Sequence, residues 1–221
     1  MVDVDAAAEG IVEVCRRVAA ESDRFRELDA QLGDGDLGIT VAYGCEAAGA
    51  RAAAGGIETF DALFAAVGEA FSEANPSTMG GLVGIGLRKA AREAGSVATL
   101  DAASWASLLE AAIEGIQRRG GAAVGDKTIL DALSGSHARL SEDGEAQETG
   151  GSVARAVREG AERGAAAVVD QTSRVGRASW QGDRSRGIPD PGAELWCSIA
   201  RAIEAVAGGD PAPRTPGLGS A

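Results

Sequence analysis

The stretch "ETFDALFAAVGEAF", residues 58–71, decides the fold class of this chain. Its large apolar side chains recur at intervals of three and four residues, which places them on one face of an α-helix. The stretch "DAASWASLLEAAIEGI", residues 101–116, repeats this spacing. Both stretches are therefore predicted to be amphipathic helices with one buried stripe. The apolar positions of the first stretch are Phe60, Leu63, Phe64, Val67 and Phe71.

The rest of the chain also favours helices. No segment shows the sustained apolar–polar alternation of a strand. Aromatic residues make up 4% of the chain and glycine numbers 32 residues, so small side chains should let helices approach closely. The sequence predicts an all-α fold of about eight helices in one domain over 1–207, followed by a flexible Pro/Gly-rich tail over 208–221. The six further helices are predicted over 4–22, 39–53, 80–94, 127–137, 152–171 and 192–207.

Composition and charge exclude several classes of partner. The chain has 221 residues, 45% of them apolar, and a net charge of −12. This length and composition favour one packed core over disorder. Nucleic acid does not suit so acidic a chain, because duplex binding depends on clustered Lys and Arg. A phosphorylated ligand remains compatible if a metal ion supplies the missing positive charge.

Cysteine usage and hydropathy indicate the compartment. Cys15, Cys45 and Cys197 are odd in number and far apart, so we expect free thiols and neither a disulfide framework nor a zinc site. No segment approaches about 20 uninterrupted apolar residues, and the N-terminus lacks the pattern of a signal peptide. We therefore expect a cytoplasmic protein that does not bind a membrane.

The stretch "LDAQLGDGDLGIT", residues 28–40, concentrates negative charge among glycines. If a helix ends near Asp29 and a glycine turn follows, the carboxylates of Asp29, Asp34 and Asp36 can converge on one point. A divalent cation would relieve their repulsion, and hard oxygen ligands favour Mg²⁺ or Ca²⁺. The alternative is an acidic, solvated turn that caps the next helix.

The stretch "GGAAVGDKTILDAL", residues 120–133, places glycines ahead of a predicted helix. It is not a Walker A loop, because Asp126 stands before Lys127 where that motif has glycine. A helix N-terminus is a natural anion site, so Lys127 and Thr128 are candidates to face phosphate or a partner. The alternative is simple capping of the helix by Asp126.

The segment 174–192 carries the densest positive charge of this acidic chain, from Arg177, Arg184 and Arg186. We interpret it as a flap over a polyanion, with Arg177 as the best candidate contact. The alternative is a surface loop whose arginines balance nearby carboxylates. The only histidine, His137, lies outside these motifs and is expected at the surface, which removes a Ser–His–Asp mechanism from contention.

Three segments together resemble a known family. "LDAQLGDGDLG", "GDKTILDAL" and "GRASWQGDRSRGIPDPGA", in this order and spacing, resemble the nucleotide-binding (L) subunit of dihydroxyacetone kinase. That subunit is equivalent to the C-terminal domain of the single-chain ATP-dependent enzymes. The resemblance covers about residues 5–207. It implies an eight-helix antiparallel barrel whose loops at one end bind ATP or ADP through two Mg²⁺ ions.

The resemblance also implies residue roles. The metal ligands would be Asp29, Asp34 and Asp36. The nucleotide-binding positions would be Gly38, Thr40, Ser77, Thr78, Met79, Gly80, Gly121, Thr128, Ile129, Arg177, Asp190 and Pro191.

The activity implied by the resemblance is phosphotransfer that requires a partner chain. Phosphate from ATP would pass to a short ketose held on a separate K-type kinase subunit. A relay through bound ADP, rephosphorylated by a phosphotransferase-system protein, stays open, as does a homodimer. The alternative to an enzyme is a regulatory subunit that binds Mg-nucleotide without turnover.

Three positions depart from the family pattern. Leu37 and Ile188 stand where the family has histidines, and Met79 stands where a serine contacts phosphate. Ser77 and Thr78 are neighbouring hydroxyls that can substitute for that serine. Because the three aspartates are retained, we interpret the chain as a divergent branch in which metal and nucleotide binding survive.

Overall fold

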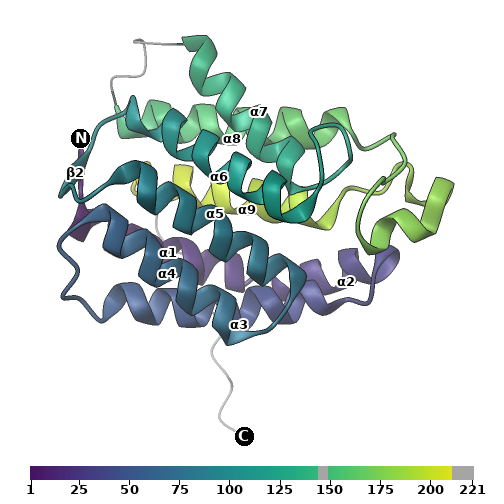
Figure 1. Cartoon of the computed structure of the whole chain (residues 1–221), viewed down its shortest axis with the longest axis horizontal. Coiled ribbons are helices and arrows are strands. Elements are labelled where there is room, and N and C mark those ends of the chain that lie inside the picture. Colours follow the sequence, from purple (N-terminus) through teal and green to yellow (C-terminus); the bar gives the residue numbers. More distant parts are fainter. Residues whose placement is uncertain (144–148, 211–221) are drawn as a thin grey trace, which may run out of the picture.

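The helices form a closed ring of antiparallel neighbours. The computed structural model of the protein describes residues 1–143 and 149–210. Each ring helix packs against the next one along the chain, and the last packs against the first (Figure 1). The predicted eight-helix antiparallel barrel is thereby confirmed. The ring consists of α1 (Val4–Ala19), α3 (Asp36–Ala53), α4 (Phe60–Ala74), α5 (Thr78–Ala94), α6 (Ser104–Gly120), α7 (Ile129–Asp143), α8 (Gly150–Ala167) and α9 (Pro191–Ala207).

A further helix, α2 (Ser22–Leu32), was not predicted. The prediction of one helix over 4–22 is wrong at its end, because α1 stops at Ala19 and α2 starts three residues later. Only Phe25 and Leu32 of α2 are buried, so its apolar spacing is weak. The helix extends beyond the ring and packs against α3 and α9.

Other helix boundaries differ from the predicted ones by a few residues. Helix α7 is longer than the predicted 127–137, and α8 covers Gly150–Ala167 in place of 152–171. A 3₁₀ helix, η2 (Arg177–Ser185), lies inside the predicted loop. Two short strands, β1 (Val2–Asp3) and β2 (Thr99–Leu100), pair antiparallel with Val2 opposite Leu100. They are too short to show any alternation of apolar and polar residues.

The predicted tail begins with a described turn. Gly208 N–H donates to Glu204 O at 2.8 Å, and Asp210 N–H donates to Ala205 O at 2.9 Å. These bonds close the end of α9. Residues 211–221 of the predicted tail lie outside the described residues.

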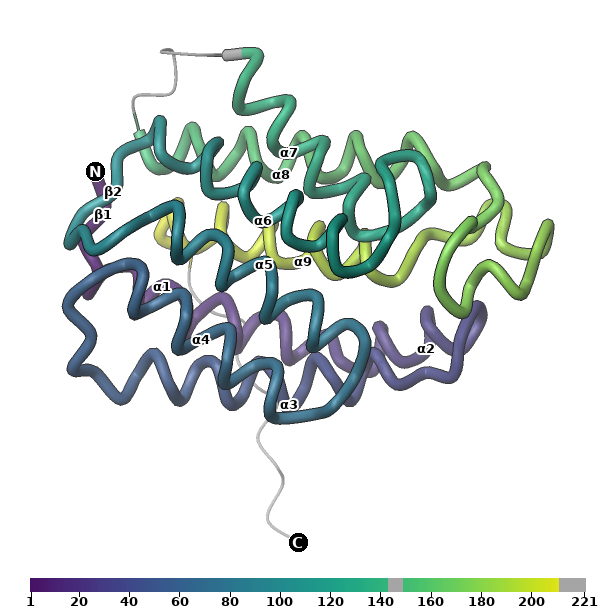
Figure 2. The backbone as a smooth tube through the Cα atoms, in the orientation of Figure 1, coloured from purple at the N-terminus to yellow at the C-terminus, as the bar shows by residue number. Residues whose placement is uncertain are grey.

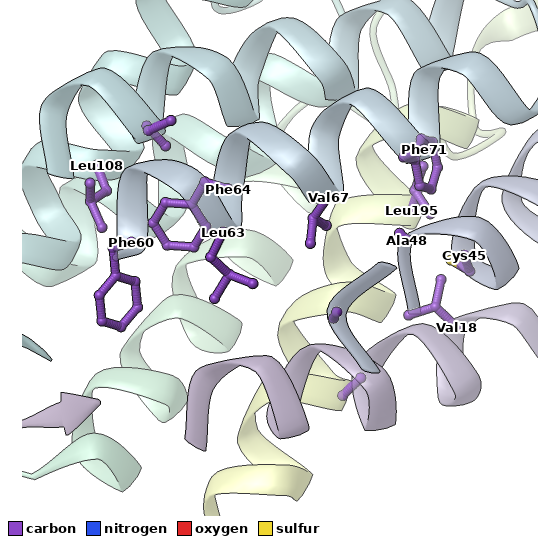
Figure 3. Packing of buried hydrophobic residues seen from close by; sticks show 14 of the residues in the cluster. Val18, Cys45, Ala48, Phe60, Leu63, Phe64, Val67, Phe71, Leu108 and Leu195 are labelled. Atoms are coloured by element: carbon purple, nitrogen blue, oxygen red, sulfur yellow. The ribbon is translucent and has the colours of Figure 1, made fainter. Parts of the chain in front are cut away.

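The predicted apolar stripe of α4 is buried in the core (Figure 3). The stripe packs with Val41 and Cys45 of α3 and Val18 of α1. A second cluster lies among α6, α7, α8 and α9. Met79 at the start of α5 packs against both clusters, so the interior is continuous at that point. The stripe residues are Phe60, Leu63, Phe64, Val67 and Phe71.

Helices α7 and α8 meet backbone to backbone. A Cβ added at Gly135 or Gly164 would overlap the backbone of the opposite helix. A Cβ added at Gly160 would lie 2.6 Å from Ser136 Cα, which is closer than any real Cβ contact. Glycine therefore permits this close approach, as the abundance of small residues led us to expect.

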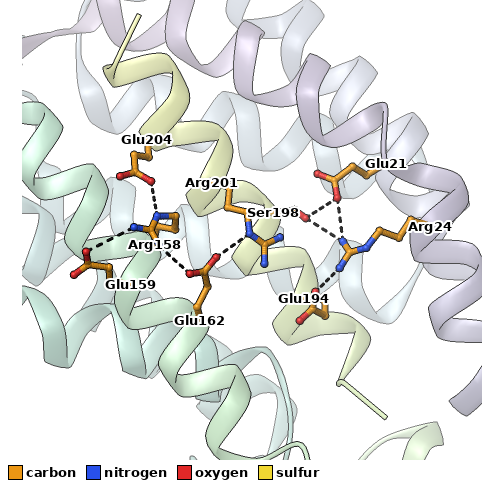
Figure 4. A network of polar contacts seen from close by, with 9 residues as sticks. All are labelled: Glu21, Arg24, Arg158, Glu159, Glu162, Glu194, Ser198, Arg201 and Glu204. Atoms are coloured by element: carbon orange, nitrogen blue, oxygen red, sulfur yellow. Dashed lines mark hydrogen bonds and ion pairs between the residues drawn. The ribbon is translucent and has the colours of Figure 1, made fainter. Parts of the chain in front are cut away.

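Ion pairs fix helix α9 against its neighbours (Figure 4). Arg158 of α8 pairs with Glu204 of α9, and Arg201 of α9 pairs with Glu162 of α8 at 2.9 Å. On the other side, Arg24 of α2 pairs with Glu194 of α9. Single exposed pairs contribute only about 0–1 kcal/mol, but several in a network fix the register of a helix. The network fixes α9 along its length, from Glu194 near its start to Glu204 near its end.

The antiparallel ring gathers helix N-termini at one end. Helices α3, α5, α7 and α9 all begin at the right-hand end in Figures 1 and 2, next to α2 and η2. The strand pair closes the opposite end. Cysteines 15, 45 and 197 are free, as predicted. Within the described residues, no helix is both long and apolar enough to cross a bilayer.

Candidate functional site

The three aspartates of the acidic stretch converge, as predicted. Asp29, Asp34 and Asp36 each offer one carboxylate oxygen, and these oxygens all lie within 4.8 Å of one another. Asp29 comes from the last turns of α2, Asp34 from the connecting turn and Asp36 from the first position of α3. The cluster therefore sits between α2 and α3 at the end of the ring where helix N-termini gather.

Glycines shape the turn that carries the cluster. Gly33 N–H donates to Asp29 O at 2.6 Å and ends α2. Gly35 has φ +77°, a left-handed conformation that favours glycine, and it immediately precedes α3. A Cβ at Gly38 would lie 2.5 Å from Ser22 O, so glycine there lets α3 pack directly on α2. Gly38, a predicted nucleotide contact, thus has a packing role.

Repulsion inside the cluster is visible at Asp29. Its half-buried carboxyl has a raised pKa, first because of desolvation and further because Asp36 and Asp34 lie nearby. Leu37 N–H opposes this rise by donating to Asp29 Oδ2 at 3.4 Å. A positive charge placed among these oxygens would lower the same pKa.

A guanidinium group from a distant part of the chain faces the cluster. Arg177, the first residue of η2, forms ion pairs with Asp34 and with Asp36, the second at 3.2 Å. The pKa of Arg177 is raised by Asp36, by Asp34 and by Asp29. Of the three arginines predicted to lie over a polyanion, Arg177 is the one that meets the aspartates. Arg186 instead pairs with Asp183 at 3.0 Å, as the alternative of local charge balance supposed.

The donor set fits a hard divalent cation. Carboxylates are the ligands that Mg²⁺ and Ca²⁺ prefer, and three of them here lie close enough together to share one ion. The cluster already attracts the positive charge of Arg177. Asp29, Asp34 and Asp36 are therefore the residues that would hold the metal.

A group of small polar side chains lies beneath the same end of the ring. Thr40 Oγ1 donates to Ser77 Oγ at 2.9 Å and accepts from Asn75 Nδ2 at 2.9 Å. Ser77 also accepts from Gly80 N–H at 2.9 Å and so caps α5. The structure brings together Thr40, Ser77 and Gly80, all predicted site residues, and adds Asn75, which sequence reasoning missed. The Asn-Pro pair ahead of "STMGG" was the available signal for a polar turn.

The substituted positions face inward. The side chain of Leu37 is buried in the core beside Val41, so it does not face a partner or substrate. Met79 is half-buried, and a Cβ added at Gly192 would lie 2.8 Å from its Cε, so Met79 packs beneath the start of α9. Thr78, the neighbouring hydroxyl, is exposed.

Lys127 does not face the site, contrary to prediction. Its side chain is only 1% exposed, and its ammonium group donates to backbone carbonyls. Asp126 does not cap α7 either, since its carboxylate accepts from Ala123 N–H at 2.8 Å. The N-cap is Thr128, whose Oγ1 accepts from Leu130 N–H, and Asp131 in the first turn reaches back to accept from Thr128 N–H at 2.7 Å and from Gly125 N–H at 2.5 Å. Sequence reasoning placed the cap at Asp126 because it started this helix at residue 127, whereas α7 begins at Ile129.

Asp190 and Pro191 start helix α9. Asp190 Oδ2 accepts from Ala193 N–H at 2.8 Å, and Pro191 occupies the first turn, as predicted. Burial, with a smaller contribution from Asp131, raises the pKa of Asp190 to about 7, although the hydrogen bond from Ala193 N–H and the charge of Lys127 oppose the rise.

The remaining predicted residues frame the same end of the ring. Ile129 is buried at the start of α7, and Gly121 follows the end of α6 with φ +65°. Thr128 Oγ1 accepts from Leu130 N–H at 3.2 Å. His137 lies in the middle of α7 and is half-buried.

Comparison with known proteins identifies the family. The model of the DAK2 domain matches residues 31–205, which include Asp34 and Asp36 of the aspartate cluster, Lys127 and the η2 segment. The chain belongs to the DAK2 domain family. The predicted resemblance to the nucleotide-binding part of dihydroxyacetone kinases is confirmed by this match.

Several relatives of this DAK2 protein carry kinase names. It is 32% identical over 213 residues to the L-erythrulose 1-kinase of Mycolicibacterium smegmatis, with 89% of this chain and 36% of that protein covered. It is 30% identical to the ADP-binding subunit DhaL of the PTS-dependent dihydroxyacetone kinase of Lactococcus lactis, with 88% and 93% covered. The chain thus spans about a third of the erythrulose kinase but nearly all of DhaL.

The fold recurs in a solved structure. The dihydroxyacetone kinase from C. freundii in complex with AMP-PNP and Mg²⁺ matches 91% of this chain and 34% of its own, with a TM-score of 0.69 and 23% identity. At this level of identity the likeness concerns the fold.

Proposed function

We propose that this DAK2 protein is the Mg-nucleotide-binding subunit of a dihydroxyacetone-type kinase. The observation that carries the proposal is the cluster of Asp29, Asp34 and Asp36 at the end of the ring where helix N-termini gather. The kinase names of relatives support it. The AMP-PNP and Mg²⁺ bound to the C. freundii kinase, which shares this fold, support it as well.

Each part of this end of the ring suits phosphate. Mg²⁺ held by the aspartates would neutralise phosphate charge and orient the phosphate oxygens. Arg177 carries several N–H donors beside the cluster and can donate them to a phosphate. The N-termini of α3 and α5 add backbone N–H groups and favourable helix dipoles. Ser77 accepts two hydrogen bonds, which leaves its own O–H free to donate.

The residues of this chain hold and neutralise charge; they do not abstract a proton. The only histidine lies in the middle of α7, and the carboxylates of the cluster are committed to the cation. A general base and the short ketose would therefore come with a K-type partner subunit. Phosphate would pass from ATP, or through bound ADP recharged by a phosphotransferase-system protein, as the name of the Lactococcus relative suggests.

A regulatory subunit without turnover is the second candidate. Two observations favour it: Leu37 is buried in the core, and Met79 fills space beneath α9 where the family has a phosphate-contacting serine. Nucleotide binding would survive these changes, because the aspartates and Arg177 keep their geometry. The two candidates differ only in turnover.

The metal assignment is tested by Asp34→Asn, with calorimetric titration of Mg-ADP as the measurement. We expect the variant to lose Mg-dependent ADP binding while its helicity stays unchanged. Asp23→Asn is the matched control, since Asp23 is an exposed acid of α2 outside the cluster. Unaltered binding by Asp34→Asn would refute the carboxylate assignment.

Enzyme and regulator are separated by a turnover assay. The protein is mixed with K-type subunits, ATP and a panel of three- and four-carbon ketoses, and ADP release is followed. Turnover that requires both partner and ketose establishes the kinase. Tight binding of Mg-ADP with no turnover across the panel establishes the regulatory role instead.

A further inference from the structure

Lys127 is a buried ammonium group with all of its donors used. Its Nζ donates to Val169 O at 2.7 Å, Gln171 O at 3.0 Å and Ser185 O at 2.6 Å. A lysine ammonium has three N–H donors, so none is left for a ligand. A buried cation is stable only when it is paired or fully hydrogen-bonded, and these carbonyls meet that need.

The three carbonyls belong to both ends of one segment. Residues 169–187 leave α8, form η2 and return towards α9. Gly187 N–H donates to Val169 O at 2.9 Å and closes the segment into a loop. Lys127 therefore joins the first part of the loop, at Val169 and Gln171, to its last part, at Ser185.

Neighbouring bonds reinforce the same junction. Ser185 is fully buried, and its hydroxyl accepts from Ser173 N–H at 2.9 Å and donates to Gly182 O at 2.7 Å. Arg174 N–H donates to Asp126 O, next to Lys127, at 3.1 Å. These bonds surround the two ends of η2, whose first residue is Arg177.

The backbone at Lys127 is also specialised. Its φ of +64° lies in the left-handed region, which non-glycine residues adopt at a cost. Such a conformation persists when the surrounding contacts determine it. The three hydrogen bonds to carbonyls fix this conformation, because they require the Lys127 side chain to enter the interior at this point.

We propose that Lys127 is a positioning residue for Arg177. Its ammonium group locks the base of the 169–187 loop, and the locked loop holds the Arg177 guanidinium against Asp34 and Asp36. Lys127 thus acts on the aspartate cluster without touching it. This role replaces the phosphate contact that its place beside a glycine-rich turn first indicated.

Hydrogen exchange without any ligand tests the first half of the proposal. Lys127→Met keeps the apolar length of the side chain but removes the donors. We expect amide exchange in residues 169–187 to accelerate roughly tenfold or more, with little change in α4. The matched control is Leu63→Ala, which weakens the core through a buried cavity in α4 and leaves the loop intact. Equal acceleration across the chain in both variants would overturn the proposal.

Metal binding tests the second half, which rests on the proposed metal role of the aspartates. Arg177 competes with a cation for the same oxygens, so Arg177→Gln should bind Mn²⁺ alone roughly two- to fivefold more tightly, the scale of an exposed ion pair. Lys127→Met should show the same gain, and the double variant no further gain. A residue that merely supports the fold would lower metal affinity or leave it unchanged.

The outcomes separate this proposal from the proposed function. A gain in Arg177→Gln with none in Lys127→Met would overturn the link between the two residues. If no variant binds Mn²⁺, the metal assignment fails, and the exchange comparison still decides the role of Lys127. If Lys127→Met does not fold, Ser185→Ala takes its place, because it loosens the same junction without leaving carbonyls around a missing charge. Ser185→Ala without faster loop exchange would then overturn the proposal.

Discussion

At the scale of single residues, Asp190 combines two roles that oppose each other. Its carboxylate caps α9 through Ala193 N–H, which favours the ionised form. Burial and the nearby Asp131 favour the neutral form and raise the pKa to about 7. Burial wins, so the folded protein holds a proton on Asp190 where the unfolded chain, with the ordinary pKa of 3.8, has released it.

This balance predicts a pH dependence of stability. Below pH 3.8 both states are protonated at Asp190, and above about pH 7 both are ionised. Between these values the folded state binds more protons than the unfolded chain. The contribution of Asp190 to the free energy of unfolding therefore falls as pH rises, by at most ~1.4 kcal/mol per pH unit. Asp190→Asn keeps a capping oxygen and removes the titration. We therefore expect denaturant unfolding of the wild type and of Asp190→Asn to give free energies of unfolding whose dependence on pH differs between these values.

Asp3→Asn provides the control for capping itself, because Asp3 caps α1 through Ala6 N–H at 2.8 Å and is exposed. Parallel stability curves for the wild type and Asp190→Asn would contradict a raised pKa at Asp190.

Residues also show how far sequence reasoning could reach. Asp29, Asp34 and Asp36 were predictable because one short stretch supplies all of them. The partners of Lys127 lie 42, 44 and 58 residues further along the chain, and no local sequence pattern predicts a contact at that separation. The burial of Leu37 was likewise out of reach, because its place in the family pattern says nothing about the side chains packed around it.

At the scale of elements, the α7–α8 contact depends on glycine. Gly160→Ala would drive a methyl group into the backbone of α7 near Gly135 and Ser136. Overpacking of this kind costs about 1–3 kcal/mol or more, since neither backbone can retreat without breaking helix hydrogen bonds. Denaturant unfolding should show that loss as a lower midpoint with an unchanged slope.

Gly151→Ala is the matched control in the same helix. Its new Cβ would approach no atom closer than Thr149 Oγ1 at 3.9 Å, so the higher helix propensity of alanine should leave stability equal or improved. Equal losses in Gly151→Ala and Gly160→Ala would mean that the interhelical contact at Gly160 does not set the cost.

Elements with a strong apolar stripe were predictable, and those held by polar contacts were not. Helix α4 buries five large side chains at helical spacing, and its boundaries were predicted within two or three residues. Helix α2 buries only Phe25 and Leu32, packs on α3 at Gly38, and is joined to α9 by ion pairs such as Arg24–Glu194. Such pairs depend on the position of α9, which local spacing does not reveal.

At the scale of the whole molecule, ligand binding at one end of the ring should stabilise all of it. The ring closes through α1 and α9, so its helices are expected to unfold together. Mg-ADP at a hundred times its dissociation constant should add about 2.7 kcal/mol. For a chain of this size that corresponds to a rise in melting temperature of roughly 5–10 °C.

Differential scanning calorimetry with and without Mg-ADP measures this rise. Asp34→Asn, melted under the same conditions, should show no shift. A wild-type melting temperature that does not change with saturating Mg-ADP would argue that this end of the ring binds no nucleotide.

The separation between Arg177 and Asp36, 141 residues along the chain, has a consequence for synthesis. At about 5–20 residues per second, the ribosome releases the aspartates roughly 7–30 seconds before their arginine. During that interval the nascent acidic turn lacks the guanidinium of Arg177, and ions of the surrounding solution can supply counter-charge. A divalent cation captured then would already be in place when the last helices close the ring.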